Sequence, residues 1–107
     1  GRLSMADSLI DGVMVAAIHI GAKNPFNMTD AEMAKTRAAL KEQLPLIRFY
    51  WGSSSEMEQA MAAGELVAAT SWNDGYAKLK KEGINVKYMN PKEGAMTWVC
   101  GFCLMTD

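Results

Sequence analysis

Apolar and polar positions follow helical spacing at the start of the chain, which predicts a largely buried helix over residues 8–22. The apolar stripe of this helix consists of Leu9, Val13, Ala17 and Ile20. Thr29 and Glu32 then have the spacing of a capping box, in which a hydroxyl and a carboxylate satisfy free N–H groups at a helix start. A second helix is therefore predicted from Thr29 to about Gln43, before Pro45.

The rest of the chain alternates short apolar runs with capped helical segments. Helices are predicted over 55–63 and 73–83, and strands over 46–51, 66–70, 84–89 and 96–104. Gly64 has the place of a residue that ends a helix in the left-handed conformation. This order predicts an α/β fold, a three-layer sandwich around a mostly parallel or mixed sheet of about five strands.

Length and charge narrow the class of protein. A chain of 107 residues fits one domain, assigned to 6–107, and residues 1–5 are interpreted as a vector-derived tail outside the fold. Lysine and arginine number 11 against 12 acidic residues, so nothing attracts a nucleic-acid backbone. The longest apolar run, 12–18, is far shorter than the ~20 residues of a membrane span.

Cys100 and Cys103 have the spacing of a redox or zinc motif. In an extended strand, residues three apart lie ~10 Å from each other, whereas a disulfide needs Cα atoms within ~7 Å. A structural zinc site needs four ligands, and His19 is the only histidine, placed in the first helix as a packing residue. Buried thiols are the favoured interpretation, no cofactor or metal is predicted, and a thiol-redox protein remains the alternative.

Two tryptophans occupy candidate binding positions. Trp72 follows the strand 66–70 and precedes a strand-to-helix turn, and such turns lie at the carboxyl edge where α/β folds bind ligands. Trp98 comes just inside a strand, after the turn 91–94. Core packing is the alternative role for both side chains.

The order of these motifs resembles a known family. Residues 64–75, GELVAATSWNDG, and residues 91–99, PKEGAMTWV, are similar to segments of the spermidine/putrescine-type periplasmic solute-binding proteins of ABC importers. The start of the first helix, from Asp7, resembles the entry into the second lobe of that family. The resemblance covers nearly all of residues 7–105.

The resemblance implies one lobe of a two-lobed, non-catalytic protein that binds a small cationic or polar solute, polyamine-like, in the cleft between the lobes. The ligand-binding positions of the family fall on Asp7, Trp72, Trp98 and Cys100. Cys100 stands where the family has an aspartate, which disfavours a ligand with several charges. The implied partners are the missing lobe and an ABC permease, and the implied location is periplasmic, although this chain has no signal peptide.

Two further expectations concern assembly and the rival function. A bare cleft and hinge surface, including 96–104, predicts a homodimer or weaker self-association. The effector-sensing lobe of a transcription regulator has a similar fold and remains a second alternative, although no DNA-binding segment is present upstream.

Overall fold

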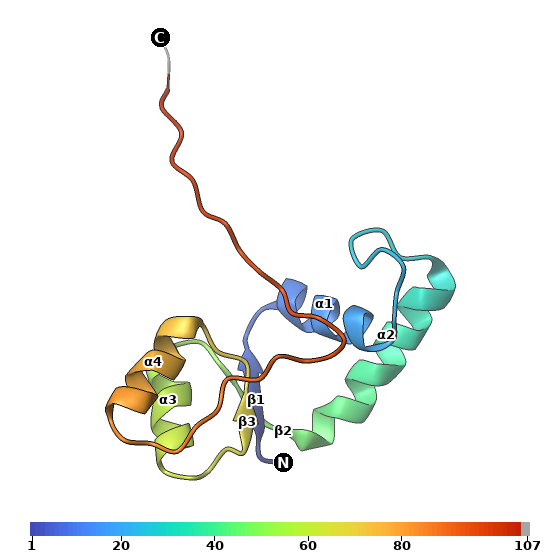
Figure 1. Ribbon diagram of the computed structural model, residues 1–107. Helices are drawn as coiled ribbons and strands as arrows, with labels where there is room; N and C mark the ends of the chain where they lie inside the picture. Colours follow the sequence, from blue (N-terminus) through green and yellow to red (C-terminus); the bar gives the residue numbers. More distant parts are fainter. Residues whose placement is uncertain (106–107) are drawn as a thin grey trace.

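A parallel sheet of three short strands lies at the centre of the computed structural model, which describes residues 1–105 (Figure 1). The strands are β1 (Leu3–Ala6), β2 (Ile47–Trp51) and β3 (Ala68–Ala69). Their order is β2-β1-β3, with Ala6 opposite Trp51 and Ser4 opposite Ala69. The strand that comes first in the sequence is therefore the central one.

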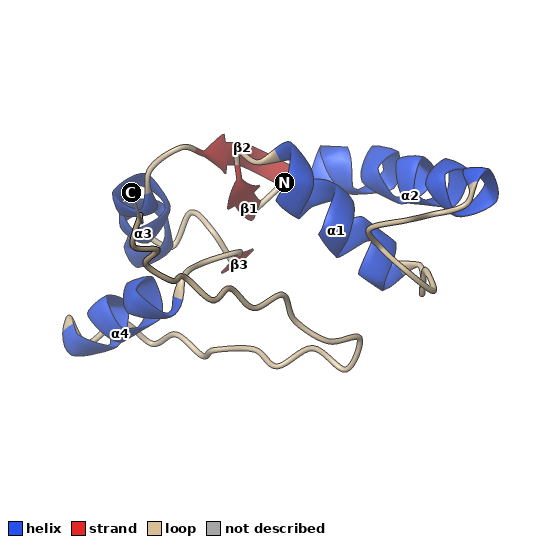
Figure 2. Ribbon diagram, turned by 90° about the horizontal axis from the view of Figure 1, so that it is seen from above, coloured by secondary structure: helices blue, strands red, loops and turns tan. Residues whose placement is uncertain are grey.

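Helices cover both faces of this sheet. They are α1 (Leu9–His19), α2 (Asp30–Gln43), α3 (Ser54–Ala62) and α4 (Asn73–Lys81), with a short 3-10 turn at Leu44–Leu46. The pair α1 and α2 lies on one side of the sheet, and α3 and α4 lie on the other (Figures 1 and 2). The predicted α/β class and its layered arrangement are confirmed. None of the helices within residues 1–105 is long and apolar enough to cross a membrane.

Local signals placed the helices correctly. The Thr29 hydroxyl accepts from the Glu32 N–H, and the Glu32 carboxylate accepts from the Thr29 N–H at 2.8 Å, which completes the capping box of α2. Gly64 follows α3 with a φ of +72°, a conformation that costs glycine little because it lacks a Cβ. The helices 55–63 and 73–83 were predicted to within two residues at each end.

Residues 1–5 do not stand outside the fold, and that part of the sequence interpretation is wrong. Leu3, Ser4 and Met5 belong to the central strand, and Ser4 and Met5 are buried. The Ser4 hydroxyl donates to the carbonyl of Phe49 at 2.8 Å, across the pairing with β2. A strand of four residues is too short to show an alternating apolar pattern, so β1 could not be predicted from its own residues.

The hydrophobic core lies mainly on the α3 side of the sheet. Its centre consists of Trp51, Met57 and Leu66, and the half-buried residues packed against it are Ala6, Phe49, Ala60, Met61 and Ala69. Full burial of side chains of this size contributes roughly 1.5–3 kcal/mol each. A smaller buried group on α1, Met14, Ala16 and Ala17, serves the opposite layer.

The predicted strands 84–89 and 96–104 are absent from the sheet, so the expectation of about five strands is wrong for residues 1–105. The chain leaves α4, turns at residues 91–94 and returns as an extended arm, residues 95–105 (Figure 2). No hydrogen bond among the described residues involves this arm. The radius of gyration is 16.0 Å, against ~13 Å for a compact chain of this length, because the arm projects from the body.

Candidate functional site

The connections of the sheet change direction between the carboxyl ends of β1 and β3, which makes this place a switch point of the topology. From β1 the chain passes over one face, through α1 and α2, to β2. From β2 it returns over the opposite face, through α3, to β3. The loops that follow β1 and β3 consequently diverge, and open α/β sheets bind ligands at such a switch point.

Asp7 lies on one side of this switch point. It follows β1 directly, and its backbone N–H donates to the carbonyl of Trp51 at 2.9 Å, which fixes its position at the sheet edge. Ser8, the next residue, caps α1 by accepting from the N–H of Asp11 at 3.3 Å. The Asp7 side chain is exposed and has no ion-pair partner within residues 1–105. Its carboxylate is therefore free to meet a cation from solution.

Trp72 and Trp98 form the other side. Trp72 is the N-cap residue of α4, just past β3, and Trp98 comes from the extended arm. The centroids of their rings lie 6.4 Å apart at 68°, an edge-to-face pair, and both side chains remain about half exposed. Aromatic pairs of this geometry contribute ~0.5–1.5 kcal/mol beyond the area they bury. This contact brings together two residues 26 positions apart that the sequence proposed separately.

Thr70 links the two sides and was not singled out from the sequence. Its hydroxyl accepts from the Ala6 N–H at 2.9 Å, and its own N–H donates to the backbone carbonyl of Ser4 at 3.0 Å. Its carbonyl accepts from the indole N–H of Trp51 at 3.1 Å. Thr70 thus holds the ends of all three strands in register. The apolar run 66–70 suggested a buried strand but not this role for the hydroxyl.

The helix that carries Trp72 is fixed from behind. Lys78 of α4 donates to the buried Glu58 of α3 at 2.5 Å, and this contact raises the pKa of Lys78. Gly75 lies close to α3, since an added Cβ would come within 3.2 Å of Glu58 and 3.7 Å of Met57, and it would also come within 2.7 Å of the Ser71 hydroxyl just before α4. Close packing and an ion pair therefore set the angle at which α4 presents Trp72.

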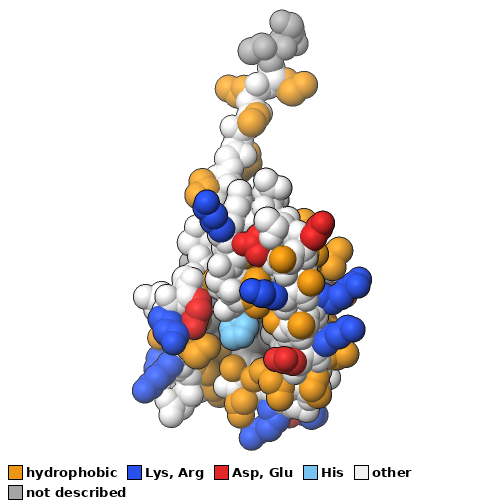
Figure 3. Space-filling model, turned by 90° about the vertical axis from the view of Figure 1, so that its right-hand side faces the viewer, with side chains coloured by type: hydrophobic (Ala, Val, Ile, Leu, Met, Phe, Trp, Pro, Cys, Tyr) orange, Lys and Arg blue, Asp and Glu red, His pale blue; other side chains and the backbone are white. Residues whose placement is uncertain are grey.

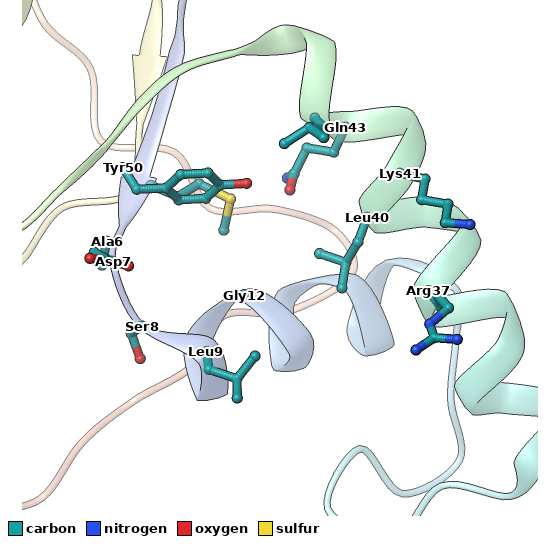
Figure 4. A pocket seen from close by; sticks show the side chains of 12 residues that line it. Ala6, Asp7, Ser8, Leu9, Gly12, Arg37, Leu40, Lys41, Gln43 and Tyr50 are labelled. Atoms are coloured by element: carbon teal, nitrogen blue, oxygen red, sulfur yellow. The ribbon is translucent and has the colours of Figure 1, made fainter.

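A groove of about 440 Å³ lies beside Asp7, on the α1–α2 side of the sheet (Figure 4). Tyr50 and Gln43 lie across from α1 there, and Leu40 of α2 reaches toward Gly12. Arg37 and Lys41 of α2 also contribute to its lining. The sequence did not indicate this groove, because it depends on how α2 docks against α1. Its volume is in the range of small-molecule sites.

The cysteines, His19 and Ile10, which stands three residues after Asp7, lie away from the switch point and on exposed surface. Cys100 and Cys103 are exposed free thiols on the arm, so the expectation that they are buried is wrong. His19 is the last residue of α1 and is exposed, and Ile10 faces solvent in the first turn. Within residues 1–105, no three His, Cys, Asp or Glu side chains gather closely enough to hold a metal ion.

The fold is that of a small α/β lobe with helices on both sides of a parallel sheet. The profile of a family described as bacterial extracellular solute-binding protein matches residues 1–107. The chain belongs to this family. Membership agrees with a role in solute binding for an ABC importer rather than in catalysis, and it implies an extracytoplasmic location.

Proposed function

We propose that the lobe binds a small cationic solute of the polyamine class at the switch point, between Asp7 and the Trp72–Trp98 pair. The observation that carries the proposal is the edge-to-face pair at 6.4 Å, which belongs to the loop after β3, while an exposed, unpaired carboxylate, that of Asp7, follows the neighbouring strand β1. Aromatic faces attract ammonium groups, and Asp7 supplies the counter-charge. Cys100, two residues beyond Trp98, contributes no charge to the proposed site. A second lobe completes the cleft in the proposed mechanism, and the closed pair is what the permease recognises.

The charges available favour a solute with one or two amines. Asp7 is the only carboxylate among the four proposed ligand residues, so further ammonium groups of a long polyamine lack partners here. Each aromatic contact is worth roughly 0.5–2 kcal/mol, and an exposed ion pair adds about 0.2–1 kcal/mol. Their sum, at most about 5 kcal/mol, corresponds to dissociation constants from about 0.2 mM upward. The lobe alone should therefore bind weakly, because enclosure by the second lobe is missing.

Titration of the isotope-labelled chain with putrescine, followed by NMR, tests the proposal. The indole N–H signals of Trp72 and Trp98 should shift together and saturate in the millimolar range, while that of buried Trp51 stays in place. Trp72→Ala should reduce the affinity several-fold, and Asp7→Asn should do so in a salt-dependent manner. Phe26→Ala is the control, since Phe26 is an exposed aromatic side chain on the loop between α1 and α2.

Two outcomes contradict the proposal. Equal shifts of the indole N–H signals with butanol and with putrescine would show that the site does not recognise the ammonium groups. Submicromolar affinity measured by calorimetry would show that binding does not depend on enclosure by a second lobe.

A further inference from the structure

The extended arm carries the two cysteines of the chain in an unusual setting. Cys100 and Cys103 are both free and both exposed, and only Gly101 and Phe102 separate them. Their neighbours are bare as well, with Val99 98% and Phe102 107% exposed relative to reference values. Figure 3 shows the arm standing clear of the body. Nothing on the described part of the protein covers the thiols from reagents in solution.

The arm is also free to bend at these residues. A strand would hold residues three apart at ~10 Å, beyond the ~7 Å that a disulfide spans between Cα atoms. No ladder hydrogen bond fixes residues 95–105 in this structure, so the objection to closure does not apply to this state. Gly101, which has no Cβ, lowers the cost of a turn between the two thiols.

Family membership supplies the chemical environment. Extracytoplasmic proteins fold in oxidising compartments, where accessible thiol pairs do not stay reduced. Two cysteines within one short segment meet each other far more often than they meet thiols on other molecules, because the effective concentration of linked groups is high. An intrachain bond is therefore favoured over a covalent dimer.

We propose that Cys100 and Cys103 are a modification site, at which a small disulfide oxidant of the glutathione type closes an intrachain disulfide. The thiolate of one cysteine attacks the oxidant, forming a mixed disulfide and releasing one reduced thiol. The thiolate of the other cysteine attacks the protein sulfur of that mixed disulfide and releases the second thiol. The two protein thiols lose two electrons in total, the oxidant gains them, and the two thiol protons end on the released molecules.

Closure has a structural consequence for the arm. The bridged segment 100–103 becomes a tight turn, and a turn of this kind cannot lie within a continuous strand over 96–104. The oxidised arm is therefore bent at residues 100–103, whereas the reduced arm can extend alongside a sheet. An exposed bridge over so short a loop is expected to be readily reduced, as labile disulfides are.

Intact-mass analysis after alkylation tests the site. The reduced chain, incubated with oxidised glutathione and then treated with iodoacetamide, should lose both alkylatable thiols and weigh two hydrogens less than the reduced protein. Cys100→Ser and Cys103→Ser should each stop at a stable glutathione adduct, because the resolving thiol is gone. The double variant should take up neither reagent and serves as the control.

The contrary results are equally specific. Two glutathione adducts on the wild-type chain, or two thiols that still alkylate, would show that the pair does not close. Covalent dimers whose share rises with protein concentration would show that disulfides form between two chains rather than within one. A failure of putrescine binding leaves this test unaffected, since the thiol count does not depend on the ligand.

Discussion

The indole N–H of Trp51 donates to the backbone carbonyl of Thr70 at 3.1 Å, so a side chain from β2 reaches across to the chain just beyond β3. The central strand β1 lies between them, and its Ala6 N–H donates to the Thr70 hydroxyl. The sheet is thus closed at its carboxyl edge by contacts to Thr70 as well as by ladder bonds. These contacts fix the strand ends from which Asp7 and Trp72 follow.

Thr70→Val keeps the size and branching of the side chain but removes the acceptor of the Ala6 N–H. A partly buried donor left without a partner costs about 1–3 kcal/mol. We expect the free energy of unfolding, measured in urea, to fall by that amount. Thr97→Val on the exposed arm should leave the stability unchanged. An equal loss in both variants would contradict a stabilising hydrogen bond between the Ala6 N–H and the Thr70 hydroxyl.

Gly75→Ala and Gly12→Ala should have opposite effects, although both glycines lie in helices. An added methyl at Gly75 meets the Ser71 hydroxyl at 2.7 Å and the Glu58 carboxylate at 3.2 Å. Both side chains would have to shift, and in doing so they would weaken the hydrogen bond from Ser71 to the Trp72 carbonyl and the contact of Glu58 with Lys78. Alanine regains about 1 kcal/mol of helix propensity, so the net change at Gly75 should be destabilising.

Gly12 of α1 has open space where its Cβ would be, so alanine there should gain about 0.5–1 kcal/mol in the free energy of unfolding. Thermal unfolding of the two variants side by side checks both signs. A stabilised Gly75→Ala variant would mean that α4 packs less closely on α3 than the structure has it.

The capping box of α2 makes stability depend on acid. The pKa of Glu32 is lowered, first by the hydrogen bond from the Thr29 N–H and then by the bond from the Lys23 N–H. Its contribution is therefore complete above the ordinary glutamate pKa of ~4.3 and is lost as the pH falls through the lower folded value. Glu32→Gln should be less stable at neutral pH and should lose less stability between about pH 5 and pH 3.

Urea unfolding over that pH series measures the difference. Glu42→Gln, at the other end of α2, is the control for removing one surface carboxylate. Identical pH slopes for Glu32→Gln and the wild type would contradict the role of the capping box.

Self-association remains a prediction, and the exposed arm supports it. The most exposed apolar side chains of the described residues lie on the arm, and contiguous patches of this kind attract partners. Light scattering at micromolar concentration should give an average mass above the 11.7 kDa of one chain. Trp98→Glu should lower this average mass, whereas Phe26→Glu should not, although Phe26 is the more exposed of the two and lies on the loop between α1 and α2. A single species near 12 kDa for the wild type would exclude the homodimer.

The helices could be predicted because their signals are local. A capping box such as Thr29 with Glu32, or a glycine such as Gly64 after an apolar stripe, acts within a few residues of where it stands. The strand 46–51 carried a similar signal in its aromatic run. These elements agree with their predictions because contacts with distant parts of the chain are not needed to predict them.

The missing strands and the edge of the site depend on distant partners. Residues 84–89 alternate as a strand does, but a strand exists only where a neighbour offers its N–H and C=O groups. Trp72 and Trp98 could be proposed from the sequence because one follows a strand signal and the other a turn signal. Arg37 and Lys41 could not, because they line a groove that depends on how α2 docks against α1. Cys100 was placed in a buried strand by the same alternation and lies on the exposed arm instead.

The position of β1 at the centre of the sheet also governs the order of events in biosynthesis. Ser4 bonds to a residue 45 positions later, and Ala6 bonds to one 64 positions later. Closing loops of this length costs about 3–4 kcal/mol before any strand pairing returns it, and such non-local topologies fold slowly. While the ribosome is still making residues 1–46, β1 has neither of its neighbours, and the sheet can form only after residue 70 has emerged. Until then Ser4 and Met5, which the finished sheet buries, have no neighbouring strand to cover them.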